Sequence, residues 1–407
     1  MTGQPKTDPA RRVVITGAGA ISSIGVGTAE FLAGLRAGRR GAGPITAFDT
    51  TGFDHANGCE VTGFEPERWI ERLDPVELGP AARFAVAAAR MAVADARLTP
   101  RELTAGHVLV SVGTTDGETR DLDRLVAGDT DLAVARRASP ARLATSVARE
   151  FAVTDVEAMT VPTACAAGNY AIGYGFDAIR AGEADLAFCG GADAACLKTF
   201  AGFYRLGTIA PDCCRPFDVS RKGILTSEGA GMLVLESLAS ALARGAGIHA
   251  EVLGYGLNCD AHHPVAPLQE SVADCMRLAL ADAGVQPREV DLVSAHGTGT
   301  QANDRTEAGA IHEVFGDRPP RTVSMKSMLG HAMGAASALA AIGCTLALEH
   351  GFIPPTVNHV ETDPECGLDC VPNQAVAADL RIVQNNGLAF GGNNSVVVFG
   401  RYEGVAA

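Results

Sequence analysis

Short apolar runs alternate with Ala-rich stretches along most of the chain. The runs are rich in β-branched residues and have the length of buried strands, whereas the Ala-rich stretches carry apolar residues at helical spacing. We expect strands over 12–19, 107–113, 158–162, 185–191, 232–236, 251–256, 291–295 and 395–400, and helices over 80–96, 134–150, 166–182, 271–284 and 332–349. This β-α-β rhythm predicts an α/β fold with a mostly parallel sheet covered by helices on both faces.

The first run, RVVITGAG, ends in glycines and predicts a buried parallel strand followed by a loop. A dinucleotide-binding loop would need a third glycine at position 22, which is Ser22, and an acidic residue about 20 positions further on. Both are missing. The pattern therefore favours a plain strand-to-helix turn.

Composition narrows the class of protein. The chain has 407 residues, of which 47% are hydrophobic, enough for two domains or one duplicated unit. A net charge of −14 argues against nucleic acid and anionic membranes as main partners. Apolar runs stop well short of 18 residues. We expect the first eleven residues to form a flexible tail, and they contain no apolar signal segment. We expect a cytoplasmic protein with no membrane-spanning helix.

The eleven cysteines show no zinc-ligand spacing. Cys213 and Cys214 are adjacent and Cys366 and Cys370 are four apart, with no second pair nearby. Several others lie within apolar runs. The sequence predicts free thiols in a reducing compartment and no metal site.

Cys165, in VPTACAAG, differs from the other cysteines by its position. A strand–turn–helix transition there would place its sulfur at a helix N-terminus, where the dipole and free N–H groups favour a thiolate. On position alone it is as well explained as a small core residue.

Two histidines strengthen the case for a site. His296 lies in AHGTGTQAND after a predicted strand, and His331 lies in GHAMGAAS, five residues after Lys326. Ligands of parallel sheets bind at the carboxyl ends of the strands. Cys165, both histidines, Lys326 and the FGGNN turn all fall at such ends, so we expect them to meet.

Four ordered motifs, VPTACAAG, AHGTGTQANDRTE, SMKSMLGHAMGAAS and LAFGGNN, together resemble the elongating β-ketoacyl-acyl carrier protein synthases. The resemblance covers nearly the whole chain. It implies a thiolase-like fold, a duplicated five-layer α-β-α-β-α arrangement with two mostly parallel sheets. The halves would span 12–250, with Cys165, and 251–407, with the histidines and Lys326. The implied reaction is a decarboxylative Claisen condensation of an acyl thioester with malonyl-carrier protein.

The same resemblance assigns roles to individual residues. Cys165 matches the nucleophile, and His296 and His331 match the pair that promotes decarboxylation. Lys326 matches a supporting lysine, Glu307 its ion-pair partner, and Asp304 a neighbour in that network. The N–H groups of Cys165 and Phe390 match an oxyanion hole. The residues implied to bind the substrate or its pantetheine arm are Thr298, Thr300, Leu388, Ala389, Phe390 and Asn394.

The implied partners are acyl carrier protein and a second subunit, which is either another copy or a chain-length-factor-like protein. No metal or redox cofactor is implied. Arg68, Arg72 and Arg205 are candidates for a basic patch that docks the carrier. Where many relatives read GFGGTN, this chain has Leu388 and Ala389 before Phe390, which favours a specialised polyketide or polyene pathway.

Two other classes fit less well. A thiolase acting on CoA esters needs a second cysteine in a C-terminal Gly-rich turn, but that turn is FGGNN and the last cysteine is Cys370. A non-catalytic chain-length factor would lack Cys165.

Overall fold

The computed structural model describes residues 8 and 12–404, so most of the predicted tail lies outside the described residues. Its centre is one large sheet made of two five-stranded half-sheets. The first contains, in spatial order, β6 (Val156–Val161), β5 (Val108–Gly113), β7 (Leu186–Asp193), β9 (Gly229–Ser237) and β1 (Val13–Ser22). The second contains β12 (Arg321–Val323), β11 (Leu292–Ser294), β15 (Ile382–Leu388), β16 (Asn393–Gly400) and β10 (Ala250–Cys259).

The two half-sheets have the same topology. In each, the strands lie in the order third, second, fourth, fifth, first along the chain. The second strand is parallel to the third and fourth, whereas the fifth is antiparallel to both of its neighbours. The halves join where β1 pairs antiparallel with β10. The structure therefore shows a duplicated unit, which the recurring glycine-ended strands only hinted at.

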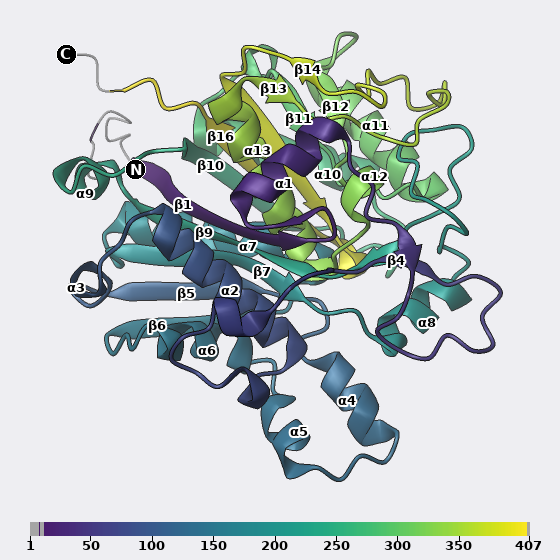
Figure 1. The fold of residues 1–407 in the computed structure, drawn as a ribbon. Helices are drawn as coiled ribbons and strands as arrows, with labels where there is room; N and C mark the ends of the chain where they lie inside the picture. The colour runs from purple at the N-terminus through teal and green to yellow at the C-terminus, as the bar shows by residue number, and fades with distance from the viewer. Residues whose placement is uncertain (1–7, 9–11, 405–407) are drawn as a thin grey trace.

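Helices form the other three layers (Figure 1). On the outside, α2 (Pro80–Asp95) and α6 (Arg142–Glu150) cover the first half-sheet, and α10 (Gln269–Ala283) with α11 (Gln301–Phe315) cover the second. Between the half-sheets lie α7 (Ala167–Ala181) and α13 (Ala336–His350), which contact strands of both. The segment Met333–His350 is long and apolar enough to cross a membrane, but 89% of it is buried inside the protein, as expected of a core helix.

The remaining elements are short. They are β2 (Gly25–Val26), α1 (Thr28–Ala37), β3 (Gly43–Pro44), β4 (Asn57–Cys59), η1 (Pro66–Arg68), η2 (Pro75–Glu77), α3 (Pro100–Leu103), α4 (Thr119–Val126), α5 (Leu132–Arg137), η3 (Ala164–Ala166), α8 (Leu197–Arg205), β8 (Thr226–Ser227), α9 (Leu238–Ala243), η4 (Pro287–Glu289), α12 (Lys326–Leu329), η5 (Met333–Ala335), β13 (Phe352–Ile353), β14 (Val376–Ala377) and η6 (Phe390–Gly392).

The expected loop after the first strand is wrong. β1 continues through the glycines to Ser22 and is antiparallel to both neighbours, not parallel. The glycines serve packing instead, because a Cβ on Gly17 would lie 2.2 Å from the Ala92 carbonyl oxygen. One on Gly19 would lie 2.0 Å from that of Ala88. They let α2 rest directly on the strand.

The single helix expected over 134–150 is also wrong. The structure has α5 and α6 with a break over residues 138–141. Pro140 lies in the break; proline has no N–H to donate and disfavours helical backbone at the preceding residue.

Candidate active site

Cys165 lies in η3, the tight turn between β6 and α7. The preceding Ala164 has φ of +51°, an uncommon value for a residue with a side chain, which marks a strained turn. The Cys165 side chain is buried, and burial raises the pKa of its thiol to about 12, although the Lys326 ammonium pulls the pKa down. The expected lowering of this pKa at a helix N-terminus is wrong, because desolvation of the thiolate outweighs it.

His296 follows β11 and is buried. Burial, with the positive charge of Lys326, lowers the pKa of its imidazole well below the usual value, so the ring is neutral. The Lys326 Nζ lies 3.4 Å from its Nδ1. An ammonium has no lone pair, so Nδ1 must be the acceptor and the ring proton lies on Nε2.

His331 follows α12 and is also buried. Burial and Lys326 lower the pKa of its imidazole well below the usual value. The Met333 N–H donates to its Nδ1 at 3.2 Å, which again leaves the proton on Nε2. The two imidazole rings stand edge to face at 82°, with centroids 5.4 Å apart. The site thus holds two neutral histidines that are both Nε2–H donors.

Glu307 and Lys326 support His296 from two sides. The Glu307 carboxylate accepts from the N–H groups of His296 (2.7 Å) and Gly297 (2.8 Å) and from the Asn386 amide (3.0 Å). Lys326 Nζ donates to the His296 carbonyl at 2.6 Å. The expected direct Lys326–Glu307 ion pair is wrong: among the described residues, the two charges share the His296 backbone and attract each other only at longer range.

Cys165, His296 and His331 line one cavity of about 330 Å³. Of the predicted residues, Thr298, Thr300, Leu388, Ala389 and Phe390 line it too. The two threonine hydroxyls are 2.9 Å apart, so both face the same wall. The walls are mostly apolar, with a few polar groups, as is usual for sites that bind small organic ligands.

The structure is compatible with an oxyanion hole at Cys165 and Phe390. Each lies among the first two residues of a three-residue 3₁₀ segment, where an N–H has no acceptor inside the segment. Among the described residues, no hydrogen bond from either N–H to another residue is recorded. Two free donors at one cavity suit a developing oxyanion.

Asn394 does not fit the expected role in binding substrate. Its side chain is buried away from the lining of the cavity. The amide donates to Asn258 Oδ1 (2.9 Å) and Asp260 Oδ1 (2.6 Å), which ties β16 to the end of β10. It therefore supports the sheet behind the FGGNN turn.

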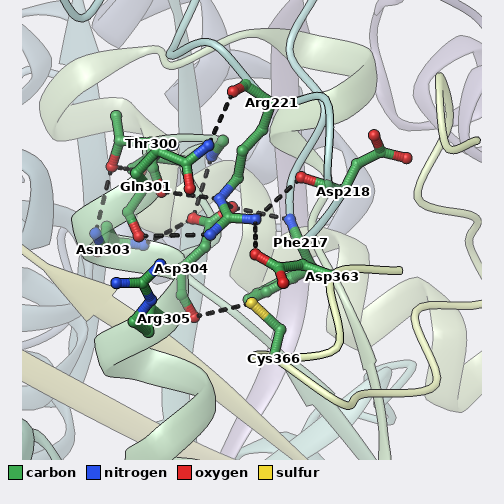
Figure 2. A network of polar contacts seen from close by, with 12 residues as sticks. Phe217, Asp218, Arg221, Thr300, Gln301, Asn303, Asp304, Arg305, Asp363 and Cys366 are labelled. Carbon is green, nitrogen blue, oxygen red and sulfur yellow. Dashed lines mark hydrogen bonds and ion pairs between the residues drawn. The ribbon is translucent and has the colours of Figure 1, made fainter. Parts of the chain in front are cut away.

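Asp304 belongs to a buried network that the sequence revealed only in part (Figure 2). Its carboxylate accepts from the N–H groups of Phe217 (2.8 Å) and Gly299 (3.1 Å), and burial raises its pKa to about 6. Arg221 lies 3.8 Å from it and pairs with Asp363 at 2.6 Å.

Arg221 also holds the backbone near the cavity. Its guanidinium donates to the carbonyls of Thr300 (3.4 Å) and Gln301 (3.5 Å), as Figure 2 shows. No role was predicted for Arg221, Asp363 or Asn386. For Arg221 a signal existed, since it lies in the motif RPFDVSRKG. The exposed Lys222 beside it lines the cavity and was also missed.

Comparisons with known proteins agree with this geometry. The model of the β-ketoacyl synthase N-terminal domain matches residues 10–241, and that of the C-terminal domain matches residues 249–360. Nodulation protein E of Rhizobium meliloti (strain 1021) is 39% identical and covers 96% of this chain and 99% of that protein. The 3-oxoacyl-[acyl-carrier-protein] synthase 2 of Synechocystis sp. is 36% identical and covers 97% and 99%.

Solved structures are similar over the same length. The ishigamide ketosynthase/chain length factor superposes with a TM-score of 0.95 at 62% identity, covering 97% of this chain and 100% of that one. A type II PKS acyl-carrier protein in complex with its ketosynthase bound to the hexaketide gives 0.89 at 30% identity, with the same coverage. The thiolase-like α/β fold predicted from the motifs is confirmed. The chain belongs to the β-ketoacyl synthase family, the acyltransferases that elongate fatty acid and polyketide chains.

Proposed function

We propose that this enzyme joins an acyl group held on Cys165 to malonyl-acyl carrier protein and releases β-ketoacyl-carrier protein and CO₂. One observation carries the assignment of residues: Cys165 and two Nε2–H imidazoles converge on one cavity. A nucleophile and a pair of neutral donors are what the two halves of this reaction require.

In the first half, the Cys165 sulfur attacks the thioester carbonyl of the acyl-carrier protein. A new C–S bond forms, the carrier's C–S bond breaks, and the thiol proton ends on the pantetheine sulfur. The high pKa of Cys165 fits this exchange, since one thiol replaces another and no proton is released. The N–H groups of Cys165 and Phe390 stabilise the tetrahedral oxyanion.

In the second half, the malonyl carboxylate leaves as CO₂ and its electron pair becomes an enolate. His296 and His331 donate their Nε2–H groups to the enolate oxygen, while Lys326 and Glu307 hold His296 in place. The enolate carbon attacks the carbonyl of the Cys165 thioester, the C–S bond to Cys165 breaks, and the departing thiolate takes up one proton from water. Thr298 and Thr300 hold the pantetheine arm.

The reaction needs no resident cofactor, because the loss of CO₂ drives formation of the C–C bond. The carrier protein is acidic, so basic residues at the cavity mouth should dock it. Lys222 lines the cavity, and Arg205 is exposed two residues after the lining residue Phe203. Arg68 and Arg72 remain candidates from the sequence. Eleven free cysteines support a cytoplasmic location.

We also propose a dimer. β6 is an edge strand of the large sheet, and most of its side chains are only partly buried. Such an edge pairs readily with another strand. A second copy and a chain-length-factor-like subunit are both suitable partners; the similar ishigamide structure is described as a ketosynthase/chain length factor.

The alternative, a thiolase that works on CoA esters without decarboxylation, is less well supported. It would use a second cysteine near the nucleophile. Among the described residues that line the cavity, Cys165 is the one cysteine. Cys366 and Cys370 are buried in a separate core cluster under α10 and α11.

The test separates the two half-reactions. Incubation with acyl-carrier protein should add the acyl mass to the peptide that contains Cys165, and C165A should remove the adduct. His331→Ala should leave this adduct nearly intact and abolish CO₂ release from malonyl-carrier protein. An adduct on another cysteine, or equal loss of both steps in H331A, would contradict the assignment.

A further inference from the structure

The turn that follows His331 is hydrogen-bonded to Asp193, a buried carboxylate that has no role in the mechanism proposed so far. Asp193, the last residue of β7, is fully buried and lies outside the lining of the cavity. Its carboxylate accepts four hydrogen bonds. They come from Thr114 Oγ1 (2.6 Å) and from the N–H groups of Thr115 (2.8 Å), Asp116 (2.9 Å) and Gly334 (2.6 Å).

These bonds join three segments that meet almost without side chains. A Cβ on Gly334 would lie 2.5 Å from the Thr114 Cα, and one on Gly191 would lie 2.4 Å from the Gly334 carbonyl oxygen. η5, the end of β5 and the end of β7 therefore touch through their backbones. The Asp193 carboxylate binds η5 to the segment that follows β5, because it accepts hydrogen bonds from both.

The hydrogen bond from Gly334 to Asp193 lies one residue away from the hydrogen bond that orients His331. Gly334 follows Met333, whose own N–H donates to His331 Nδ1. Met333 has φ of +49°, so this part of η5 is strained and needs external contacts to keep its shape. If η5 shifts, the Met333 N–H no longer fixes which nitrogen of His331 carries the proton.

We propose that Asp193 is a positioning residue for decarboxylation: by holding η5 it keeps the Nε2–H of His331 aimed at the enolate oxygen. The proposal rests on the proposed function, because it concerns the second half-reaction of that mechanism. Asp193 touches no substrate, since its oxygens are already bonded to protein donors. Cys165 lies in η3, which packs against η5, but among the described residues η3 makes no hydrogen bond to the Asp193 carboxylate. Acyl transfer should therefore depend on Asp193 less than decarboxylation does.

The principal experiment measures both half-reactions in Asp193→Ala, using the full-length enzyme with its natural partner subunit. CO₂ release from malonyl-carrier protein should fall on the order of a hundredfold, because small displacements of a reacting group have effects of this size. Acyl transfer to Cys165 should fall far less than CO₂ release, because the displaced turn carries His331 and not Cys165. Asp193→Asn, which keeps an acceptor for some of the four donors, should lie between the wild type and D193A.

A small anion supplies a readout that a merely structural role would not move. D193A leaves four donors around an empty space of carboxylate size. Added formate should therefore restore part of its CO₂ release in a dose-dependent way, and neutral formamide should not. If D193A fails to fold, the split between the two half-reactions in D193N decides the matter.

Glu236→Ala is the matched control. Glu236 is a fully buried carboxylate on the adjacent strand β9, paired with Arg244 at 2.6 Å and remote from the cavity lining. Any loss in E236A should affect both half-reactions alike and show no response to formate. Equal loss of both steps in D193A and D193N, or no formate response in folded D193A, overturns the proposal. A wild-type enzyme that performs neither step overturns the proposed function instead.

Discussion

The turn before α7 and the turn before α13 have closely similar backbones. Each is a 3₁₀ segment in which a non-glycine residue has positive φ, +51° at Ala164 and +49° at Met333. Each leads into a central helix, at the corresponding place in its half of the duplicated fold. The next residue is Cys165 in the first turn and Gly334 in the second. One lines the cavity, and the other is packed against Thr114 and bonded to Asp193.

The difference between the Cys165 turn and the Gly334 turn shows that the two halves of the duplicated fold use the same backbone for different purposes. The first turn keeps its N–H and its thiol available to a substrate. In the second turn the equivalent N–H is taken by an internal carboxylate, and no side chain fits. That turn instead orients His331, which lies three residues before Gly334. Under the proposed mechanism, a shared backbone thus serves nucleophilic attack in one half and histidine placement in the other.

The largest effect should come from giving the second turn a side chain. In Gly334→Ala the new Cβ would lie 2.5 Å from the Thr114 Cα, and backbone cannot yield as a flexible side chain can. We expect a loss of at least about 1–3 kcal/mol in unfolding free energy from overpacking, together with loss of CO₂ release.

Urea unfolding of G334A and of the control Gly202→Ala checks this. Gly202 lies in the exposed face of α8 with nothing near its missing Cβ, so alanine there should be neutral or stabilising by up to about 1 kcal/mol. Similar urea midpoints for the two variants would contradict the close packing of Gly334 against Thr114.

A smaller effect is expected where the Asn169 side chain ties α7 to β15. Asn169 of α7 donates to the Asn385 carbonyl at 3.1 Å, and its Oδ1 accepts from the Asn385 amide at 2.9 Å. Its own N–H donates to Ser337 Oγ of α13 at 3.1 Å. Asn169→Ala should cost about 1–3 kcal/mol, because buried partners lose their hydrogen bonds.

This cost should appear as a lower urea midpoint and slower acylation of Cys165, which precedes Asn169 by one helical turn. Asn57→Ala is the control, since the amide of Asn57, in the short strand β4, makes one bond, to the Pro211 carbonyl at 2.8 Å. An equal drop of the urea midpoint in both variants would mean that the Asn169 hydrogen bonds beside the first turn stabilise the protein no more than an ordinary polar contact does.

The smallest effect is expected at His249, beside the C-terminal end of α13, where ion pairs take the place of the amide hydrogen bonds described above. His249 lies 2.9 Å from Asp95 at the end of α2 and 2.8 Å from Glu349 at the end of α13. Burial alone would lower its pKa, but the two carboxylates outweigh it and raise the pKa to about 10. The folded pKa lies above the unfolded one, so this stabilisation is complete below about pH 6.5 and is lost as pH rises through about 10.

His249→Gln should therefore lower the unfolding free energy by about 1 kcal/mol at pH 6, reduced by partial exposure, and by much less above pH 10. Chemical denaturation at both pH values measures the difference. A constant difference between the two pH values would contradict the charged form of His249. CO₂ release in H249Q should stay close to the wild-type rate.

Much of the site could be predicted because its chemistry is local in the sequence. Cys165, His296 and His331 each sit in a Gly-rich segment after an apolar run, and parallel strands bring such segments to one edge. Errors arose where packing decided the outcome. The glycines of β1 predicted a turn but serve the close approach of α2, and Asn394 lies in a binding motif but supports the sheet.

By itself the sequence determined the alternation of strands and helices and most of the long elements, the motifs and the residues able to act as nucleophile and donors. These follow from side-chain type and from periodicity, which are properties of neighbouring residues. Only the tertiary structure decided the protonation of those residues and the contacts that hold them. The raised pKa of Cys165, the neutral Nε2–H forms of both histidines and the bond from Gly334 to Asp193 depend on burial and on segments up to 141 positions apart in the chain. No local pattern encodes the dielectric environment or the approach of such distant backbones.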